Sequence, residues 1–301
     1  MTHVEALRFM RDSARRAEYA DLLRDCYLDE DLRAAAERFR TSAEFVESLR
    51  LLNTHCASSA QAIHDPAISG KTLSNQTVLD LGAGTGIAAY SFAQSGATHV
   101  YALEPDPSLE LGRAAIASLV GKLPVTILEG NGENIPLAND CVDVVYARQV
   151  LHHAADLPGM LREVERVLRP SGLFLACREH VVDDAAGLAE FLARHPVHRL
   201  AGGEHAYNLR VYLAAIEDAN LRIVTVLKPW STIINLYPMA HSREEADELP
   251  RMILEKKLGG AGRIVGSLPW AVNVARAYLN RRREPGRLFS FLARKSQRNE
   301  S

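Results

Sequence analysis

The sequence predicts an α/β fold built on a seven-stranded, mostly parallel sheet. From Thr77 to Pro229, short apolar runs alternate with segments in which apolar residues recur every three or four positions. This alternation is typical of parallel strands joined by crossover helices. A glycine-rich turn, GAGTG at residues 82–86, directly follows the first run. The predicted strands are TVLDL, HVYALE, PVTILEG, CVDVVYA, SGLFLACREHVV, LRIVTVLKP and GRLFSFLARK.

Helical segments flank and interrupt this region. Residues 1–70 show helical spacing of apolar residues, as in AEYADLLRDCYL and AEFVESLRLL, and predict a helical N-terminal cap. Residues 71–301 are then expected to form the α/β domain. About fifty-five residues separate the last two predicted strands, which is long enough for elements of their own. We therefore predict a helical insert at about 231–285.

Composition narrows the class of protein. The 301 residues carry a net charge of -2, whereas a dedicated nucleic-acid binder usually shows a basic excess. The one tight basic run, Arg281 to Arg283, is typical of a solvated helix end. Four separated cysteines without a CxxC pair argue against structural zinc. No signal peptide or spanning run is evident, so we expect a cytoplasmic protein without nucleic-acid or membrane partners. The oligomeric state is not indicated.

The glycine turn has the features of a ligand loop. Gly82, Gly84 and Gly86 lie between a strand and a helix, where glycine lets the backbone approach a ligand closely. The spacing G-x-G-x-G differs from the dinucleotide fingerprint G-x-G-x-x-G, because Ile87 stands at the sixth position. Asp80 precedes the loop, and its carboxylate would repel a pyrophosphate. The pattern favours a ligand that carries positive charge.

These residues resemble a known family. VLDLGAGTGIAA is similar to motif I of the class I S-adenosylmethionine-dependent methyltransferases, of the bacterial small-molecule type called methyltransferase type 11. EGNGENIPLANDCVDVV and LREVERVLRPSGLFLA resemble later parts of that family's pattern, so the resemblance covers about residues 77–182. It implies a Rossmann-like sheet and S-adenosylmethionine as cofactor.

The resemblance also implies roles for individual residues. Glu104 would bind both ribose hydroxyls, since one carboxylate can accept two hydrogen bonds from a diol. Asn131 stands where the family usually has Asp and would meet the adenine amino group, and the Gly132 amide would meet a ring nitrogen. The full set of expected cofactor contacts is Asp80, Gly82, Ala83, Gly84, Gly86, Glu104, Pro105, Asn131, Gly132 and Arg148.

Catalytic candidates follow the fourth and fifth strands. Ligands of open parallel sheets bind at the carboxyl ends of the strands, so the segments ARQVLHHAAD and CREHVVDD are expected at this edge. Glu179 and His180 end the fifth strand and can reach an acceptor there. His152 is expected to have a structural role or to line the cofactor. His153, His180 and His205 are candidate general bases, because the imidazole pKa lies near 6.5.

The segment HPVHRLAGGEHAY at residues 195–207 is expected on the same rim. Three interpretations remain open for it: a polar lid over the acceptor site, a purely structural loop, or a metal site. HExxH-type spacing is absent, so no metal is predicted.

We therefore predict transfer of a methyl group from S-adenosylmethionine to a small-molecule acceptor, at an oxygen of a sugar or secondary metabolite. The alternatives are N- or C-methylation of a small molecule, transfer to RNA or protein, and a non-catalytic S-adenosylmethionine binder.

Overall fold

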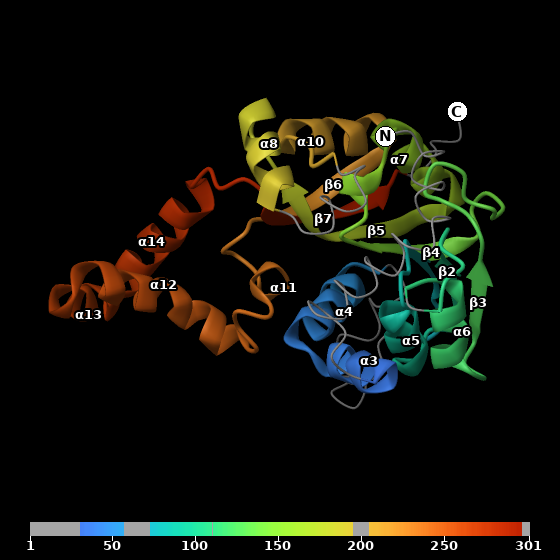
Figure 1. Cartoon of the computed structure of the whole chain (residues 1–301), viewed down its shortest axis with the longest axis horizontal. Helices are drawn as coiled ribbons and strands as arrows, with labels where there is room; N and C mark the ends of the chain where they lie inside the picture. Colours follow the sequence, from blue (N-terminus) through green and yellow to red (C-terminus); the bar gives the residue numbers. More distant parts are fainter. Residues whose placement is uncertain (1–30, 57–72, 110, 195–204, 297–301) are drawn as a thin grey trace.

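The computed structural model describes residues 31–56, 73–109, 111–194 and 205–296. Within them, seven strands form one sheet in the order β3-β2-β1-β4-β5-β7-β6 (Figure 1). Strands β1 to β5 pair in parallel, and β7 runs antiparallel to β5 and β6. The predicted fold class is confirmed. The strands are β1 (Thr77–Leu81), β2 (His99–Leu103), β3 (Val125–Leu128), β4 (Val142–Arg148), β5 (Leu168–Val181), β6 (Leu221–Leu227) and β7 (Arg287–Lys295).

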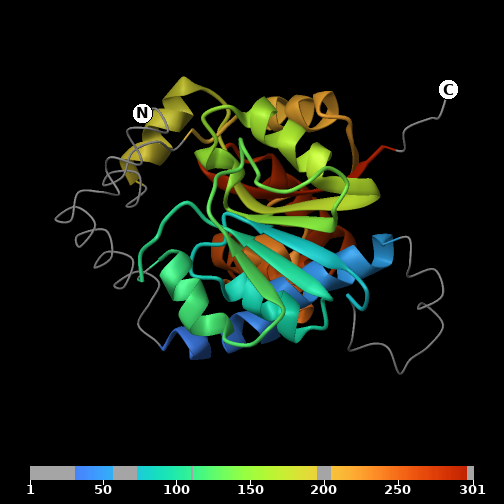
Figure 2. The same ribbon diagram turned by 90° about the vertical axis from the view of Figure 1, so that its right-hand side faces the viewer.

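Helices cover both faces of the sheet, as Figure 2 shows. One layer comprises α3 (Leu32–Thr41), α4 (Ala43–His55), α5 (Ile87–Gln94) and α6 (Arg113–Val120). The other comprises α7 (Leu157–Val167), α8 (Ala185–Arg194) and α10 (Leu209–Asp218). Each face has its own cluster of buried apolar side chains, so the sheet is the central layer of a three-layer sandwich.

Local sequence explains where α7 begins and which side it buries. The Asp156 side chain accepts a hydrogen bond from the Gly159 amide at the N-terminus, and Pro158 lies in the first turn. Met160, Leu161 and Val164 recur at helical spacing and are buried against the sheet. The buried apolar side of α7 holds the helix against the sheet, and this sets the positions of the segments before and after it.

The described part of the N-terminal cap consists of α3 and α4, which pack into the sheet core. Ring centroids of Phe39 and Phe45 are 5.3 Å apart, those of Phe45 and Phe92 are 5.1 Å apart, and those of Phe92 and Tyr146 are 5.0 Å apart. This row of aromatic contacts runs from the cap through α5 to β4. The cap therefore shares the hydrophobic core of the α/β domain. The predicted domain boundary at residue 70 lies outside the described residues.

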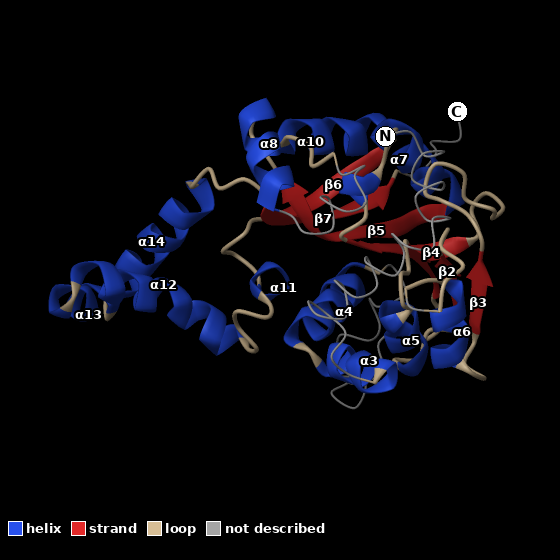
Figure 3. Cartoon of the chain, viewed as in Figure 1, coloured by secondary structure: helices blue, strands red, loops and turns tan. Residues whose placement is uncertain are grey.

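The region between β6 and β7 is helical, as predicted. It contains α11 (Ile233–Leu236), α12 (Arg243–Leu258), α13 (Gly260–Gly266) and α14 (Pro269–Arg281). Helix α11 contacts α4, β5 and β7. Helices α12 to α14 project away from the sheet (Figure 3). Among the described helices, none has the length and apolar character needed to cross a bilayer.

Candidate functional site

The glycine loop lies at the carboxyl end of β1, between β2 and β4. Gly82, Gly84 and Gly86 all have positive φ, at 66°, 55° and 83°. A Cβ on Gly82 would lie 2.7 Å from Val150, and one on Gly86 would lie 3.0 Å from Ile116. A Cβ on Gly84 would meet nothing within 4 Å. Gly82 and Gly86 are thus required by packing, whereas Gly84 faces open space where a ligand can approach the backbone.

Glu104 is held beside this loop by backbone amides. Its Oε2 accepts a hydrogen bond from the Gly84 amide at 2.7 Å, and its Oε1 accepts one from the Asp106 amide at 2.9 Å. Burial raises the pKa of the Glu104 carboxyl to about 7, against the lowering effect of both amides. Because each carboxylate oxygen has further acceptor capacity, the group can still bind a diol. The Pro105 carbonyl accepts from Arg113 at 2.7 Å, which fixes the turn after β2.

Asp80 has a buried carboxyl group, and one of its two oxygens accepts no hydrogen bond from the described residues. Burial raises its pKa to about 7, with the Ala89 amide as the principal opposing influence. Among the described residues, none donates a hydrogen bond to its Oδ2 atom. A buried acceptor of this kind usually marks a place where a ligand or water donates. Its position at the end of β1, directly before the glycine loop, matches a ligand with a cationic donor.

Asn131 and Gly132 lie on the loop after β3. The Asn131 side-chain oxygen accepts from the Glu133 amide at 3.1 Å, and Asn131 forms an isolated antiparallel bridge with Asn134. A Cβ on Gly132 would lie 2.6 Å from Met160, so only glycine lets this loop pack on α7. The loop is rigidly placed, and its predicted contacts with adenine stay a prediction.

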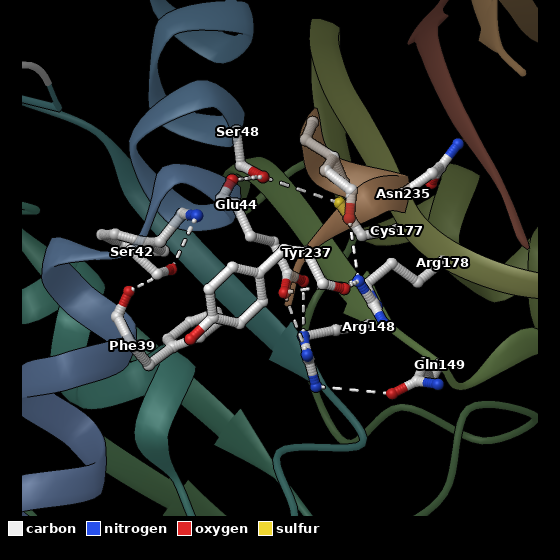
Figure 4. A network of polar contacts seen from close by, with 12 residues as sticks. Phe39, Ser42, Glu44, Ser48, Arg148, Gln149, Cys177, Arg178, Asn235 and Tyr237 are labelled. Atoms are coloured by element: carbon white, nitrogen blue, oxygen red, sulfur yellow. Dashed lines mark hydrogen bonds and ion pairs between the residues drawn. The ribbon is translucent and has the colours of Figure 1, made fainter. Parts of the chain in front are cut away.

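Arg148 has a different partner from the one expected. Its Nε and Nη2 atoms donate to the two carboxylate oxygens of Glu44, at 2.6 and 3.0 Å. Glu44 belongs to α4 and is completely buried. Figure 4 shows this bidentate pair beneath the cap. The guanidinium is engaged by Glu44, so Arg148 anchors the cap, and its predicted contact with the cofactor stays a prediction.

The same network reaches the insert. Arg178 of β5 donates to the backbone oxygens of Ile234 and Tyr237, and its Nη1 lies 3.9 Å from Glu44 (Figure 4). A register shift lies between Ala176 and Glu179, and Arg178 has a positive φ of 61°. This bulge turns Arg178 toward α4 and α11. One carboxylate therefore connects the cap, two central strands and α11.

Glu179 of β5 orients a neighbouring histidine, and its predicted reach to an acceptor stays a prediction. Its carboxylate accepts from the Val150 amide at 2.9 Å and from His152 Nδ1 at 2.8 Å. Both side chains are almost fully buried. Burial raises the pKa of Glu179, and the Val150 amide opposes this effect. The pair fixes the orientation of the His152 ring on the short 3₁₀ helix η3 (Leu151–His153).

The three candidate bases gather around His152. Ring centroids of His153 and His180 lie 4.2 and 4.9 Å from that of His152. The His205 amide donates to the His152 carbonyl at 2.8 Å. Burial lowers the pKa of His205. Val150, which precedes this histidine cluster, packs on Gly82, so the cluster adjoins the glycine loop.

His180 has a defined tautomer within this cluster. Its Nδ1 lies 2.9 Å from the Gly286 carbonyl oxygen. A carbonyl only accepts, so Nδ1 carries the proton and Nε2 carries the lone pair. The Nε2 atom lies 3.5 Å from the Gln149 amide nitrogen, on the side of the loop after β4.

Comparison with known proteins identifies the domain that carries this site. The profile of the family described as a methyltransferase domain matches residues 79–176. This part of the chain belongs to the methyltransferase domain family. The match runs from β1 through β5 and includes the glycine loop, Glu104, Asn131 and His152.

Curated methyltransferases are similar to part of this chain. An uncharacterized methyltransferase of Mycobacterium ulcerans is 31% identical over an alignment of 156 residues, and the alignment covers 46% of this chain and 60% of that protein. A ubiquinone biosynthesis O-methyltransferase of Rhizobium rhizogenes is 31% identical over 150 residues, which is 50% of this chain and 59% of that protein. The chain thus spans about three fifths of the length of these relatives.

Solved structures share the fold at low sequence identity. Geranyl diphosphate methyltransferase in complex with S-adenosylmethionine has a TM-score of 0.51 at 16% identity, covering 83% of this chain and 85% of that one. The [4+2]-cyclase SpnF has a TM-score of 0.50 at 17% identity, covering 84% of this chain and 81% of that one. The presence of a cyclase among them shows that this fold alone does not define the reaction.

The interpretations of residues 195–207 as a metal site or as a lid can be compared with the structure only in part. Most of HPVHRLAGGEHAY, residues 195–204, lies outside the described residues. Within the described residues, no three His, Cys, Asp or Glu side chains group as ligands for a metal ion. His205 and Tyr207 are described, and their rings stack with centroids 6.0 Å apart.

Proposed function

We propose that this chain binds S-adenosylmethionine at the glycine loop and catalyses methyl transfer to an oxygen of a small-molecule acceptor. The observation that carries the proposal is the buried Asp80 Oδ2 atom, which lacks a donor among the described residues beside the open space over Gly84. A loop with these two properties suits a cationic ligand that approaches the backbone closely.

The residues present fit this cofactor. Asp80 would accept hydrogen bonds from an ammonium group, and Glu104 would accept from the ribose diol. Asn131 and Gly132 would bind the adenine edge. When bound, S-adenosylmethionine supplies a methyl group already activated by its sulfonium. The protein therefore has to orient the acceptor and, for a hydroxyl acceptor, remove a proton.

Cofactor affinity is expected to depend on pH. The carboxyls of Asp80 and Glu104 have pKa values raised to about 7 by burial. Their ionised forms are favoured by the ammonium group proposed at Asp80 and by the hydroxyls proposed to donate to Glu104. Affinity should therefore fall as the pH drops below about 7, by up to about tenfold per pH unit for each carboxyl. Titration calorimetry with S-adenosylmethionine across this range measures the effect. Asp80→Asn should flatten the curve, and equal affinity at all pH values would contradict the assignment.

His180 is the base that the geometry favours. Its Nδ1 proton is held by Gly286, so Nε2 can accept the proton of an acceptor hydroxyl. His180→Gln should lower kcat by about 100-fold while the affinity for S-adenosylhomocysteine stays unchanged. His241→Gln, on the insert, is a matched control. His153→Gln and His205→Gln measured in parallel test the other two candidates. An unchanged kcat and pH profile for His180→Gln would remove it from the mechanism.

An oxygen acceptor is supported by the histidine cluster and by the O-methyltransferase named among the relatives. Sugars, phenols and other secondary metabolites are the acceptor classes to test, by mass spectrometry of reactions with S-adenosylmethionine. Methylation only at nitrogen or carbon would overturn the choice of acceptor atom. Another relative is a tRNA U34 carboxymethyltransferase, so tRNA belongs in the same panel. Tight cofactor binding without turnover of any acceptor would indicate a non-catalytic binder.

A further inference from the structure

Most of the large apolar side chains that are exposed in the described residues lie on or next to the projecting hairpin of α12, α13 and α14. Of the eleven large apolar side chains that are exposed in the described residues, eight lie between Met239 and Tyr278. Patches of this kind on a soluble domain mark an interaction surface. The most exposed of them on the hairpin are Met252, Ile264, Trp270, Val274 and Tyr278.

Helix α14 carries two adjoining apolar stripes. Ala271, Val272, Ala275 and Leu279 are buried. Trp270, Val274 and Tyr278 recur at every fourth position and form a second stripe, which is exposed to 63%, 60% and 59%. The first stripe faces the protein, whereas no described residue covers the second. The second stripe is therefore available to a partner.

The part of the hairpin from the middle of α12 onward is basic. Residues 251–283 include eight Lys and Arg and one acidic residue, Glu255, whereas residues 243–250 at the start of α12 include four acidic residues and one Arg. The Lys257 ammonium lies 5.8 Å from the centre of the Tyr278 ring, so a cation borders the apolar stripe directly. Basic and aromatic side chains beside an apolar face are typical of helices that lie in a membrane interface.

A cationic pocket adjoins the stripe at the base of α14. It has a volume of about 440 Å³, and Ala277 and Arg281 line it on the side next to the stripe. Its cationic lining residues are Lys228, Arg276, Arg281, Arg283 and Arg287, and its described lining includes no acidic side chain. Arg276 pairs with Asp247, and Arg287 pairs with Asp183. The remaining cations give the pocket a positive charge that suits a phosphate.

We propose that the α12–α14 hairpin docks on the surface of an anionic phospholipid bilayer. The stripe of Trp270, Val274 and Tyr278 enters the headgroup and acyl boundary, and the pocket at Arg281 and Arg283 takes a lipid phosphate. This proposal replaces the expectation of no membrane partner, which rested on the lack of a spanning segment. An RNA would leave the aliphatic side chains of Met252, Ile264 and Val274 exposed, because they offer no stacking surface, whereas a bilayer covers aliphatic and aromatic side chains alike. A second copy of the hairpin is the other occupant to test.

The docked hairpin would lie close to the candidate active site. Arg287, at the start of β7, pairs with Val181, at the carboxyl end of β5. The insert therefore leaves and rejoins the sheet at the edge where the histidine cluster lies. Attachment through α14 would keep this edge near the bilayer surface, which favours acceptors that partition into lipid.

Vesicle flotation tests the proposal with the full chain. The protein should float with vesicles of phosphatidylcholine mixed with phosphatidylglycerol, should float far less with phosphatidylcholine alone, and should be released by salt. Val274→Asp should lower the partition coefficient at least tenfold. Arg281→Ala together with Arg283→Ala should lower it by about 25-fold, at about fivefold for each cation. In a Trp230→Phe background, the emission of Trp270 should shift to shorter wavelength when anionic vesicles are added.

Matched variants outside the hairpin control for general effects. Val46→Asp and Arg222→Ala alter exposed residues of α4 and β6 and should float like the parent. Melting temperatures of all variants check folding. Absence of flotation with anionic vesicles at low salt overturns the proposal, as does parental flotation of Val274→Asp. If the protein does not bind vesicles but forms a dimer that Val274→Asp dissociates, the stripe binds a second copy of the chain. If it does not bind vesicles but binds tRNA, and the double arginine variant loses that binding, the surface binds RNA.

Discussion

Gly84→Arg is expected to abolish cofactor binding, with a loss of at least about 1000-fold in affinity for S-adenosylmethionine, or about 4 kcal/mol. Gly84 has a φ of 55°, and the space where its Cβ would lie is open. An arginine there fits sterically in the free protein and projects into the space assigned to the cofactor. Its positive charge would also compete for Asp80 and Glu104. Titration calorimetry and turnover with the best acceptor measure the loss.

The control separates loss of the site from backbone strain. Gly121 has the same φ of 55° and the same open surroundings, but it lies in the turn after α6. Gly121 has a ψ of -115°, a backbone conformation largely confined to glycine. Gly121→Arg should therefore cost about 1–3 kcal/mol of stability and should leave cofactor affinity intact. Parental affinity in Gly84→Arg would place the cofactor elsewhere and would overturn the proposed function.

Much of the methyltransferase fold could be predicted because its signals are local. Short apolar runs and helical periodicity predict the sheet and its crossover helices, and the insert before β7 follows from a long interval without strands. The positions of Gly82, Gly84 and Glu104 follow from where strands end. Such features depend on residues that are neighbours in the sequence, which is why pattern analysis finds them.

The contacts that define the rest of the site join residues far apart in the sequence. Glu44 and Arg148 are separated by 104 residues, and nothing in AEFVESLRLL distinguishes the buried Glu44 from the less buried Glu47. The bulge in β5 turns Arg178 toward α11, a direction that strict alternation along a strand does not predict. The pairing of Glu179 with His152 likewise depends on how the loop after β4 folds back.

The unpaired stripe of α14 illustrates a different limit. PWAVNVARAYLN has apolar residues on both sides of a helix, which in a sequence is equally consistent with a fully buried helix. Only the packing of α14, with Leu279 buried and Tyr278 exposed, shows which side is left uncovered. The sequence therefore predicted a helical insert, while its surface character required the structure.

Glu44→Gln is expected to destabilise the protein by about 3–5 kcal/mol, because it removes the buried charge that compensates the partly buried guanidinium of Arg148. Glu44 is completely buried and holds Arg148 with two hydrogen bonds, while Arg178 lies 3.9 Å away. Denaturant unfolding measures the change in the free energy of unfolding. Glu190→Gln is the matched control: its pair with Arg194 is exposed, so the loss should stay below about 1 kcal/mol.

A double variant shows where that destabilisation originates. If it comes mainly from an uncompensated Arg148, then Glu44→Gln combined with Arg148→Met should recover a large part of the lost stability, because no unpaired charge remains at that position. If Glu44 acts instead through Arg178 and α11, the double variant should be no more stable than Glu44→Gln. A loss below about 1 kcal/mol in Glu44→Gln itself would show that the network does not anchor the cap. Arg148 is the last residue of β4 and directly precedes the loop that carries the histidine cluster. If the double variant regains stability but not turnover, the pair of Glu44 and Arg148 also positions the candidate site.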